Sequence, residues 1–264
     1  MKDFRKNISF ILKQLKSAEV VIFMFDFDGT LSPIAPTPKQ AFLPVSTKKI
    51  LEKLCKFSFV AIITGRSLED IKKKVGIKKI IYAGNHGTEW QIGKQKKTIK
   101  ISRLSCQKLA EVERKFKDLV SRYPSLLVDE KKQGFSVHYR KLSASRQSKF
   151  SKEAEKIIAS YKRSKFISFF YGKKVLEAVA KTGWNKGKFA KFLIGYLKKK
   201  YKKDILPVYI GDDTTDESVF LNLKTAITAR VSRDKKSFAK YFIKNQRDVN
   251  KALHYFLNAL YKRD

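Results

Sequence analysis

The chain has 264 residues and a formal net charge of +35, from 59 Lys and Arg against 24 Asp and Glu. A hydrophobic content of 43% is ample for a packed core and excludes a disordered chain. The longest apolar run, Val20 to Phe25, is too short to span a bilayer and no leader with a cleavage site is evident, so we expect a cytoplasmic protein without a membrane partner.

The first part of the chain alternates amphipathic helices with short apolar strands. Helices are predicted over 3–18, 47–57 and 67–75, and strands over 20–25, 59–63 and 80–83. Ser67 is the expected N-cap of the third helix. This β-α-β-α-β order predicts a parallel sheet with right-handed crossovers.

The pattern changes in the middle of the chain and then returns. A hairpin over 88–101, helices over 104–122 and 145–161, and strands over 126–128, 135–140, 166–171 and 174–178 predict an α+β insert. Helices over 186–203, 216–222, 237–243 and 248–261 and strands over 206–210 and 226–229 then resume the α/β order. We therefore predict an α/β protein with a Rossmann-like parallel-sheet core, residues 1–99 and 177–264, and an inserted α+β cap domain, residues 100–176.

Polar residues follow three of the predicted core strands. The first strand ends in Asp26-Phe27-Asp28-Gly29, the second in Thr64-Gly65-Arg66, and a later one in the segment 211–217, Gly-Asp-Asp-Thr-Thr-Asp-Glu. Asp and Gly also form ordinary turns, so any one of these segments alone has a structural explanation. Three such strand ends together favour a ligand site, because ligands of open α/β sheets bind at the carboxyl ends of the strands.

The residue types at these strand ends are suited to phosphoryl transfer. Asp26 is placed to attack phosphorus and form an aspartyl-phosphate, and Asp28, on the same face of the strand, is placed to act as general acid and base. The carboxylates Asp212, Asp213 and Asp216 are oxygen ligands of the kind that Mg²⁺ prefers.

Thr64 and the backbone N–H groups of Gly65 and Arg66 are candidates for binding phosphoryl oxygens, although a Thr-Gly-Arg segment alone could be a plain turn. Lys186, at the start of a predicted helix, is the best placed of many lysines to neutralise charge at the nucleophile. The positive field of the protein would attract a phosphorylated substrate.

The chain resembles the trehalose-6-phosphate phosphatase family of the haloacid dehalogenase (HAD) superfamily. The matching segments are Asp26–Pro33, Ile63–Arg66, Gly84–Gly87, Val137–Arg140, Lys186-Gly187 and Gly211–Glu217. They are spread over nearly the whole chain. The first and last segments are specific for the superfamily. Three sequences are typical of its trehalose branch: Gly-Asn-His-Gly, His-Tyr-Arg and the residue order of the last segment.

The resemblance implies a HAD-like fold and a role for each matching residue. Asp26 is the nucleophile, Asp28 the general acid/base, and Thr64 and Lys186 bind the transferred phosphoryl group. Mg²⁺ is held by the Asp26 side chain, the Asp28 carbonyl group and Asp212, with Asp213 and Asp216 in support. The cap closes over the sugar, and the residues implied to contact the sugar are Asn85, His86, His138, Arg140 and Glu177. A separate trehalose-6-phosphate synthase that supplies the substrate is a further expectation.

One departure from the family pattern keeps alternatives open. Glu177 is followed by Ala178-Val179, where the family usually has Arg-Pro. The first alternative is another sugar phosphate as substrate, because the same core chemistry is shared by sucrose-phosphate, glucosylglycerol-phosphate and mannosyl-phosphoglycerate phosphatases.

A polyanion-binding protein on a HAD scaffold is the second alternative, motivated by the charge of +35. Because the basic residues are spread over the chain at ordinary helix-surface spacing, we do not expect nucleic acid as a partner. Cys55 and Cys106 lie near no His or Cys pair, and we expect both to be reduced and buried.

Overall fold

The computed structural model describes residues 1–261, which divide into two compact units. The first contains Met1–Thr98 and the segment from Trp184 onward, and the second is Ile99–Gly183. We predicted the second boundary between residues 176 and 177, which falls inside strand β10, Val175–Ala180. Strand β10 pairs with β8 on one side and β9 on the other, so the whole strand stays with the insert.

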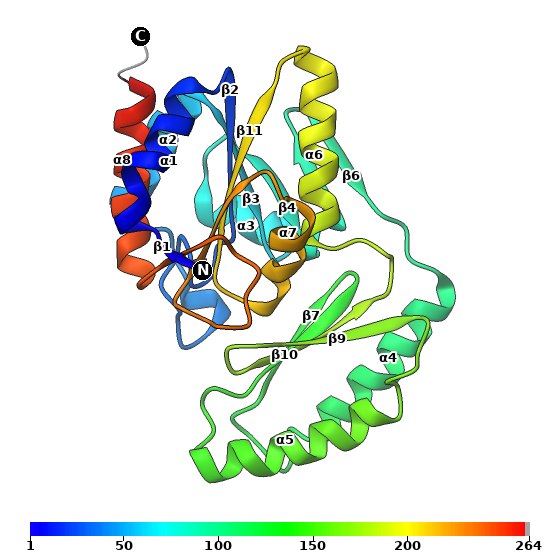
Figure 1. Ribbon diagram of the computed structural model, residues 1–264. Helices are drawn as coiled ribbons and strands as arrows, with labels where there is room; N and C mark the ends of the chain where they lie inside the picture. Colours follow the sequence, from blue (N-terminus) through cyan, green and yellow to red (C-terminus); the bar gives the residue numbers. More distant parts are fainter. Residues whose placement is uncertain (262–264) are drawn as a thin grey trace. The chain divides into compact units, whose positions relative to one another are not determined.

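The first unit is built on a nine-stranded sheet of order β1-β13-β12-β11-β2-β3-β4-β5-β6 (Figure 1). Its strands are β1 Lys2–Asp3, β2 Val20–Phe25, β3 Phe59–Ile63, β4 Ile81–Gly84, β5 Glu89–Ile92, β6 Gln95–Thr98, β11 Ile205–Gly211, β12 Ile227–Val231 and β13 Tyr241–Ile243. In the order of the sheet, all neighbours from β1 through β13, β12, β11, β2 and β3 to β4 pair in parallel. The hairpin β5–β6 adds two antiparallel strands at the edge next to β4.

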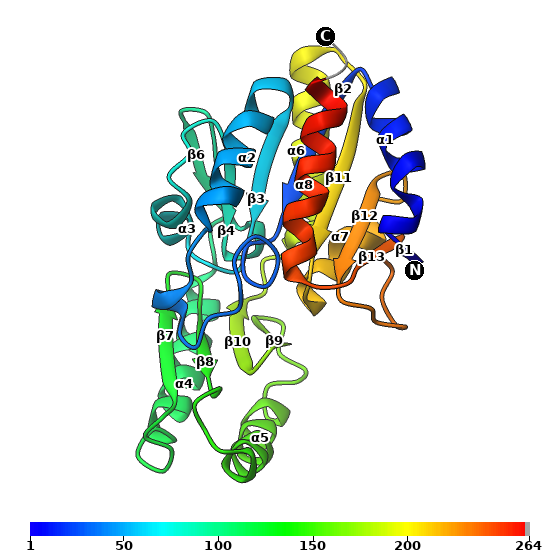
Figure 2. The ribbon, with the colours of Figure 1, turned by 90° about the vertical axis from the view of Figure 1, so that its left-hand side faces the viewer.

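Helices cover both faces of this sheet. They are α1 Ile8–Ser17, α2 Val45–Phe57, α3 Leu68–Val75, α6 Lys186–Tyr201, α7 Glu217–Asn222 and α8 Gln246–Tyr261, with short 3₁₀ turns η1 Arg5–Asn7, η2 Pro38–Gln40, η3 Asn85–Gly87 and η4 Thr214–Asp216. Helices α1, α2 and α8 lie together on one face (Figure 2), and α6 and α7 lie on the other (Figure 1). Within residues 1–261, no helix combines the length and the apolar character needed to cross a membrane.

The apolar run of β2 explains its central place. Its alternating side chains point to opposite faces, so Phe23 packs toward α8, with 4.9 Å between the ring centroids of Phe23 and Phe256. The side chains of Ile22 and Met24, on the opposite face, are also fully buried. A strand that is covered on both faces needs this continuous apolar sequence.

Two expectations from the sequence are wrong. We predicted a helix over 237–243, but Tyr241–Ile243 forms β13, which pairs in parallel with β12 and β1. Burial of Tyr241 and Ile243 against the sheet outweighs the helical pattern of so short a segment. Neither cysteine forms a disulfide, but Cys55 is only partly buried and Cys106 is exposed.

The second unit has its own sheet and its own core. Four antiparallel strands have the order β7-β8-β10-β9. They are β7 Leu127–Lys131, β8 Gly134–His138, β9 Ile167–Gly172 and β10 Val175–Ala180, with helices α4 Arg103–Asp118 and α5 Ala144–Ala159. Apolar side chains of α4 and α5 pack against Phe135, Val137, Leu176 and Ala178. The side chains between these positions, including Ser136 and Glu177, therefore point to the other face of this sheet.

Candidate active site

The carboxyl ends of β2, β3, β4 and β11 bring the predicted core residues together. Asp26 follows β2, and its backbone N–H donates to Ile210 in β11 at 2.9 Å. Thr64 follows β3, and its N–H donates to Ala83 in β4 at 2.9 Å. Because these strands are parallel and neighbouring, their ends form one edge of the sheet.

Lys186 lies between two carboxylates at this edge. Its Nζ atom is 3.0 Å from Asp26 Oδ1 and 2.8 Å from Asp216 Oδ1. Only 2% of the Lys186 side chain is exposed. Lys186 is the first residue of α6, and the Asn185 side chain caps this helix by accepting from the N–H of Lys188 at 2.9 Å. The capped start of α6 therefore fixes the backbone position of Lys186 and with it the direction in which the side chain leaves the helix.

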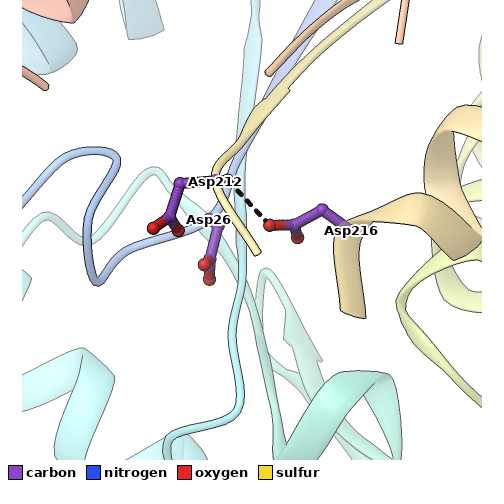
Figure 3. Close-up of side chains that lie close together, drawn as sticks. All are labelled: Asp26, Asp212 and Asp216. Carbon is purple, nitrogen blue, oxygen red and sulfur yellow. Dashed lines mark hydrogen bonds between the residues drawn. The ribbon is translucent and has the colours of Figure 1, made fainter. Parts of the chain in front are cut away.

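Asp216 is held by four donors. Its Oδ1 atom accepts from Lys186 and from the hydroxyl group of Tyr209, the latter at 2.6 Å. Its Oδ2 atom accepts from the N–H groups of Asp212 and Asp213, both at 2.9 Å. Figure 3 shows the side chains of Asp26, Asp212 and Asp216 close together, with the bond between Asp212 and Asp216 dashed. These donors occupy the lone pairs of an ionised carboxylate, so Asp216 orders the loop after β11.

The charges of the three groups are strongly coupled. Burial raises the pKa of Asp26 well above its usual value, and Asp216, Asp212 and Asp28 add to this shift while Lys186 opposes it. Burial alone would also raise the pKa of Asp216, but Lys186 and the hydrogen bonds that Asp216 accepts hold it below its usual value. Burial disfavours the charged form of Lys186, but Asp216 and Asp26 outweigh this effect and raise its pKa. The two carboxylates therefore favour the charged form of Lys186.

The same residues fit a hard cation. Oxygen atoms of Asp26, Asp212 and Asp216 all lie within 4.8 Å of one another, and all three residues are buried. When all three are ionised, these carboxylates outnumber the single ammonium group of Lys186, and a divalent cation would offset the excess negative charge. Of the other predicted ligands, Asp213 lies next to this group as the N-cap of η4, and the side chain of Asp28 is outside it.

Two glycines make room for these carboxylates. A Cβ atom at Gly29, whose φ is +80°, would lie 2.2 Å from Asp212 Oδ2. A Cβ atom at Gly211 would lie 2.3 Å from Asp216 Cγ. Both distances are far shorter than a van der Waals contact, so the close approach of these loops requires glycine.

Asp28 forms a two-point ion pair with Arg66. Arg66 Nε donates to Asp28 Oδ2 at 2.6 Å, and Arg66 Nη2 donates to Asp28 Oδ1 at 2.7 Å. Arg66 Nη1 donates to Asp70 at 2.7 Å. The Arg66 guanidinium group thus binds two carboxylates, while 41% of the Asp28 side chain remains exposed. This fork fixes the orientation of the Asp28 carboxylate.

Asn85 and His86 lie in a strained turn after β4. Their φ values are 46° and 57°, in the left-handed region that few residues other than glycine adopt. The N–H of Asn85 donates to Arg66, and that of His86 donates to Thr64, so the turn also holds the loop after β3. The Asn85 side chain donates to the buried Glu89 at 2.7 Å, a residue that the sequence analysis did not single out.

The remaining predicted sugar-binding residues lie in the second unit. His138 ends β8, and Arg140 donates to the carbonyl group of Lys173 at 2.5 Å. Glu177 accepts from Lys131 Nζ at 2.6 Å and from the Ser136 hydroxyl at 2.9 Å. The face of this sheet that carries Glu177 also carries the polar residues Asp129, Lys131, Ser136 and His138.

The sequence analysis missed Tyr209, Glu89 and Lys131. Tyr209 lies inside an apolar strand, where a fully buried hydroxyl requires a partner. That requirement was a usable signal, because the acidic segment follows directly after the strand. The pairing of Lys131 with Glu177 depends on the register of β7, β8 and β10, which no local pattern gives.

Comparisons with known proteins agree with this geometry. A family model described as Trehalose-phosphatase matches residues 24–252. Trehalose-phosphate phosphatase B of Arabidopsis thaliana is 28% identical over 258 residues, which cover 92% of this chain and 67% of that protein. Probable trehalose-phosphate phosphatase E of the same plant is 31% identical, over 86% of this chain and 63% of that protein. The chain thus spans about two thirds of the length of these relatives.

The C-terminal domain of C. albicans trehalose-6-phosphate phosphatase has a similar structure. The TM-score is 0.84 at 21% identity, and the match covers 96% of this chain and 97% of that domain. This likeness confirms the predicted HAD fold class. Since the family model matches most of its length, the chain belongs to the trehalose-phosphatase family, a family of phosphoric monoester hydrolases.

Proposed function

We propose that this chain is a Mg²⁺-dependent phosphatase that hydrolyses trehalose 6-phosphate to trehalose and phosphate through an aspartyl-phosphate on Asp26, as a step of trehalose biosynthesis. The observation that carries the proposal is the buried lysine between Asp26 and Asp216, at 3.0 and 2.8 Å. A buried lysine that only balanced charge would need one carboxylate. A second carboxylate that is fixed by three donors besides the lysine gives the lysine a defined position beside the nucleophile.

Asp26 supplies the nucleophile in this proposal. One of its carboxylate oxygens attacks phosphorus, the bond from phosphorus to the sugar oxygen breaks, and Asp28 gives a proton to that leaving oxygen. Water then attacks phosphorus in the aspartyl-phosphate, and Asp28 takes a proton from the water. The bond from phosphorus to the Asp26 oxygen breaks, so inorganic phosphate leaves and the Asp26 carboxylate is restored. Lys186 faces Asp26 throughout and offsets the negative charge that gathers on the phosphoryl oxygens. We further propose that Thr64 and the N–H groups of Gly65 and Arg66 hold those oxygens.

Magnesium is the proposed metal, with Asp26, Asp212 and the carbonyl group of Asp28 as the residues that would hold it. When bound, Mg²⁺ neutralises charge on the phosphoryl group and orients it. Asp213 and Asp216 would act in support, Asp216 through the N–H groups of Asp212 and Asp213 that it holds.

Trehalose is the proposed sugar because the chain matches the trehalose-phosphatase family. Asn85, His86, His138, Arg140 and Glu177 are the proposed sugar-binding residues, and Lys131 and Ser136 join them because both donate to Glu177. The proposal includes a separate synthase that supplies the substrate. It also includes a cytoplasmic location, which is supported by two cysteines that form no disulfide.

The test is phosphate release in the presence of Mg²⁺, with and without EDTA. Trehalose 6-phosphate is compared with sucrose 6-phosphate, glucose 6-phosphate and an aryl phosphate. We expect strong preference for trehalose 6-phosphate and complete loss of activity with EDTA. Preference for another sugar phosphate would overturn the substrate and keep the chemistry. Phosphate release that persists in EDTA would overturn the proposed dependence on Mg²⁺. The absence of release from every compound would favour a binding function.

A further inference from the structure

Tyr209 is a buried residue of β11 whose hydroxyl group faces the charged cluster. Its side chain is fully buried, and the hydroxyl donates to Asp216 Oδ1 at 2.6 Å. Its ring packs edge-on against Phe220 of α7, with 5.8 Å between the ring centroids. The ring therefore has a fixed position, and the hydroxyl is directed at the carboxylate of Asp216.

The hydroxyl of Tyr209 shares its acceptor with Lys186. Asp216 Oδ1 accepts from both groups, whereas Asp216 Oδ2 accepts from two backbone N–H groups. The ammonium group of Lys186 has two carboxylate partners, at 2.8 Å from Asp216 and 3.0 Å from Asp26. Because the two donors share one oxygen, a strong bond from Tyr209 weakens the hold of that oxygen on Lys186.

We propose that Tyr209 is a positioning residue of this enzyme, which binds Asp216 Oδ1 and thereby leaves Lys186 available to Asp26 and to the phosphoryl group. In this role Tyr209 acts through Asp216, the acceptor that it shares with Lys186. It acts by competing with Lys186 for one oxygen atom. This inference rests on the proposed function, because it assigns to Lys186 the role of binding phosphate.

Removal of the hydroxyl has a defined consequence. Asp216 Oδ1 then accepts from Lys186 without competition from Tyr209, so the ammonium group moves toward Asp216. The positive charge next to Asp26 then decreases. The bonds of Asp216 Oδ2 to the loop at Asp212 and Asp213 are unchanged, so the carboxylates proposed to hold the metal keep their positions.

The experiment is Tyr209→Phe, which keeps the ring and its contact with Phe220. Calorimetry gives two affinities on the same protein, that of inorganic phosphate at saturating Mg²⁺ and that of Mg²⁺ alone. We expect the phosphate affinity to fall about tenfold, the change expected when one charge-assisted contact is weakened, while the Mg²⁺ affinity does not fall, because less positive charge then lies next to Asp26. A defect of packing alone would lower both affinities or neither.

Tyr82→Phe is the matched control. Tyr82 is also buried in the first unit, and its hydroxyl donates to the carbonyl group of Ile77 at 2.9 Å, away from the charged cluster. We expect this variant to bind phosphate like the wild type. The Lys186→Met background completes the comparison, because Tyr209→Phe should change phosphate affinity little once the lysine is absent.

A second measurement does not depend on how the variant folds. In wild-type protein labelled with ¹³C at Cζ of tyrosine, the Tyr209 resonance should shift when phosphate is added, because Lys186 turns from Asp216 toward the phosphate. An unchanged resonance under saturating phosphate would overturn the inference. So would an unchanged phosphate affinity in Tyr209→Phe, or an equal loss of Mg²⁺ affinity. Phosphate binding does not depend on the sugar, so a protein that leaves trehalose 6-phosphate intact still tests this role of Tyr209.

Discussion

Replacement of Gly29 by alanine tests the geometry of the site most sharply. The new Cβ atom would lie 2.2 Å from Asp212 Oδ2, and ordinary contact begins at 3.4 Å. The Asp212 carboxylate must therefore retreat by about 1.2 Å, from 2.2 to 3.4 Å, or the turn after Asp28 must open by the same distance. A misplacement of about 1 Å in a catalytic site can cost about 100-fold in rate, which is the loss of turnover that we expect.

Gly93→Ala separates this clash from backbone strain. Gly93 also has a positive φ, +58°, but apart from its two chain neighbours no atom of the described chain lies within 4 Å of its Cβ position. Both variants bear the cost of a left-handed alanine, about 1–2 kcal/mol in the free energy of unfolding. Only Gly29→Ala should lose activity beyond what its loss of stability explains.

The assay is Mg²⁺-dependent phosphate release at a temperature well below the melting point of each variant. A titration with Mg²⁺ shows whether the Gly29 variant needs a higher concentration, as expected when Asp212 is displaced. Equal activity of Gly29→Ala and Gly93→Ala would refute the reasoning, because the clash at Asp212 would then have no consequence.

Three further results follow from the contacts of single residues. Arg66→Lys keeps the charge but cannot form the two-point pair with Asp28, so kcat for trehalose 6-phosphate should fall about tenfold or more at little cost in melting temperature; an unchanged kcat would show that this pair does not orient Asp28. Glu177→Gln should raise KM for trehalose 6-phosphate and leave hydrolysis of an aryl phosphate unchanged, whereas equal effects on both substrates would remove Glu177 from sugar binding. Burial raises the pKa of Cys55 to about 11, so at pH 8 only roughly 0.1% of it is thiolate, and its alkylation should rise about tenfold per pH unit up to pH 10. Mass spectrometry should find Cys106 labelled first at pH 8, and equally fast labelling of Cys55 would contradict the burial.

Much of the core could be predicted because its signals are local. The strands at Val20–Phe25 and Phe59–Ile63 are continuous apolar runs with polar ends, and Ser67 is an N-cap that accepts from Asp70 N–H at 3.2 Å. Parallel pairing then carries Asp26, Thr64 and Asp212 to one edge of the sheet without further information. Strand β13 was missed because three residues carry too little pattern, and its pairing with β12 decides its conformation.

The contacts inside the site could not be predicted in the same way. The sequence analysis assigned the backbone N–H group of Arg66 to the phosphoryl oxygens, but the pairing of its guanidinium group with Asp28 depends on how two loops meet in space. The four donors of Asp216 likewise come from β11, from α6 and from its own loop. Tyr209 was predicted only as part of a strand. Which face of the strand it lies on, and so which groups it contacts, depends on the packing of α6 and α7. Contacts between elements distant in sequence require the folded chain.

The most direct test of the central claim is hydrolysis of trehalose 6-phosphate by the Asp26→Asn variant at saturating Mg²⁺, beside the wild type. The variant should keep the wild-type fold, because Lys186 retains Asp216 as a charged partner at 2.8 Å. The account predicts that the wild type releases phosphate and that Asp26→Asn, with a similar melting temperature, releases none above background. Phosphate release by a well-folded Asp26→Asn at a rate close to that of the wild type would contradict it.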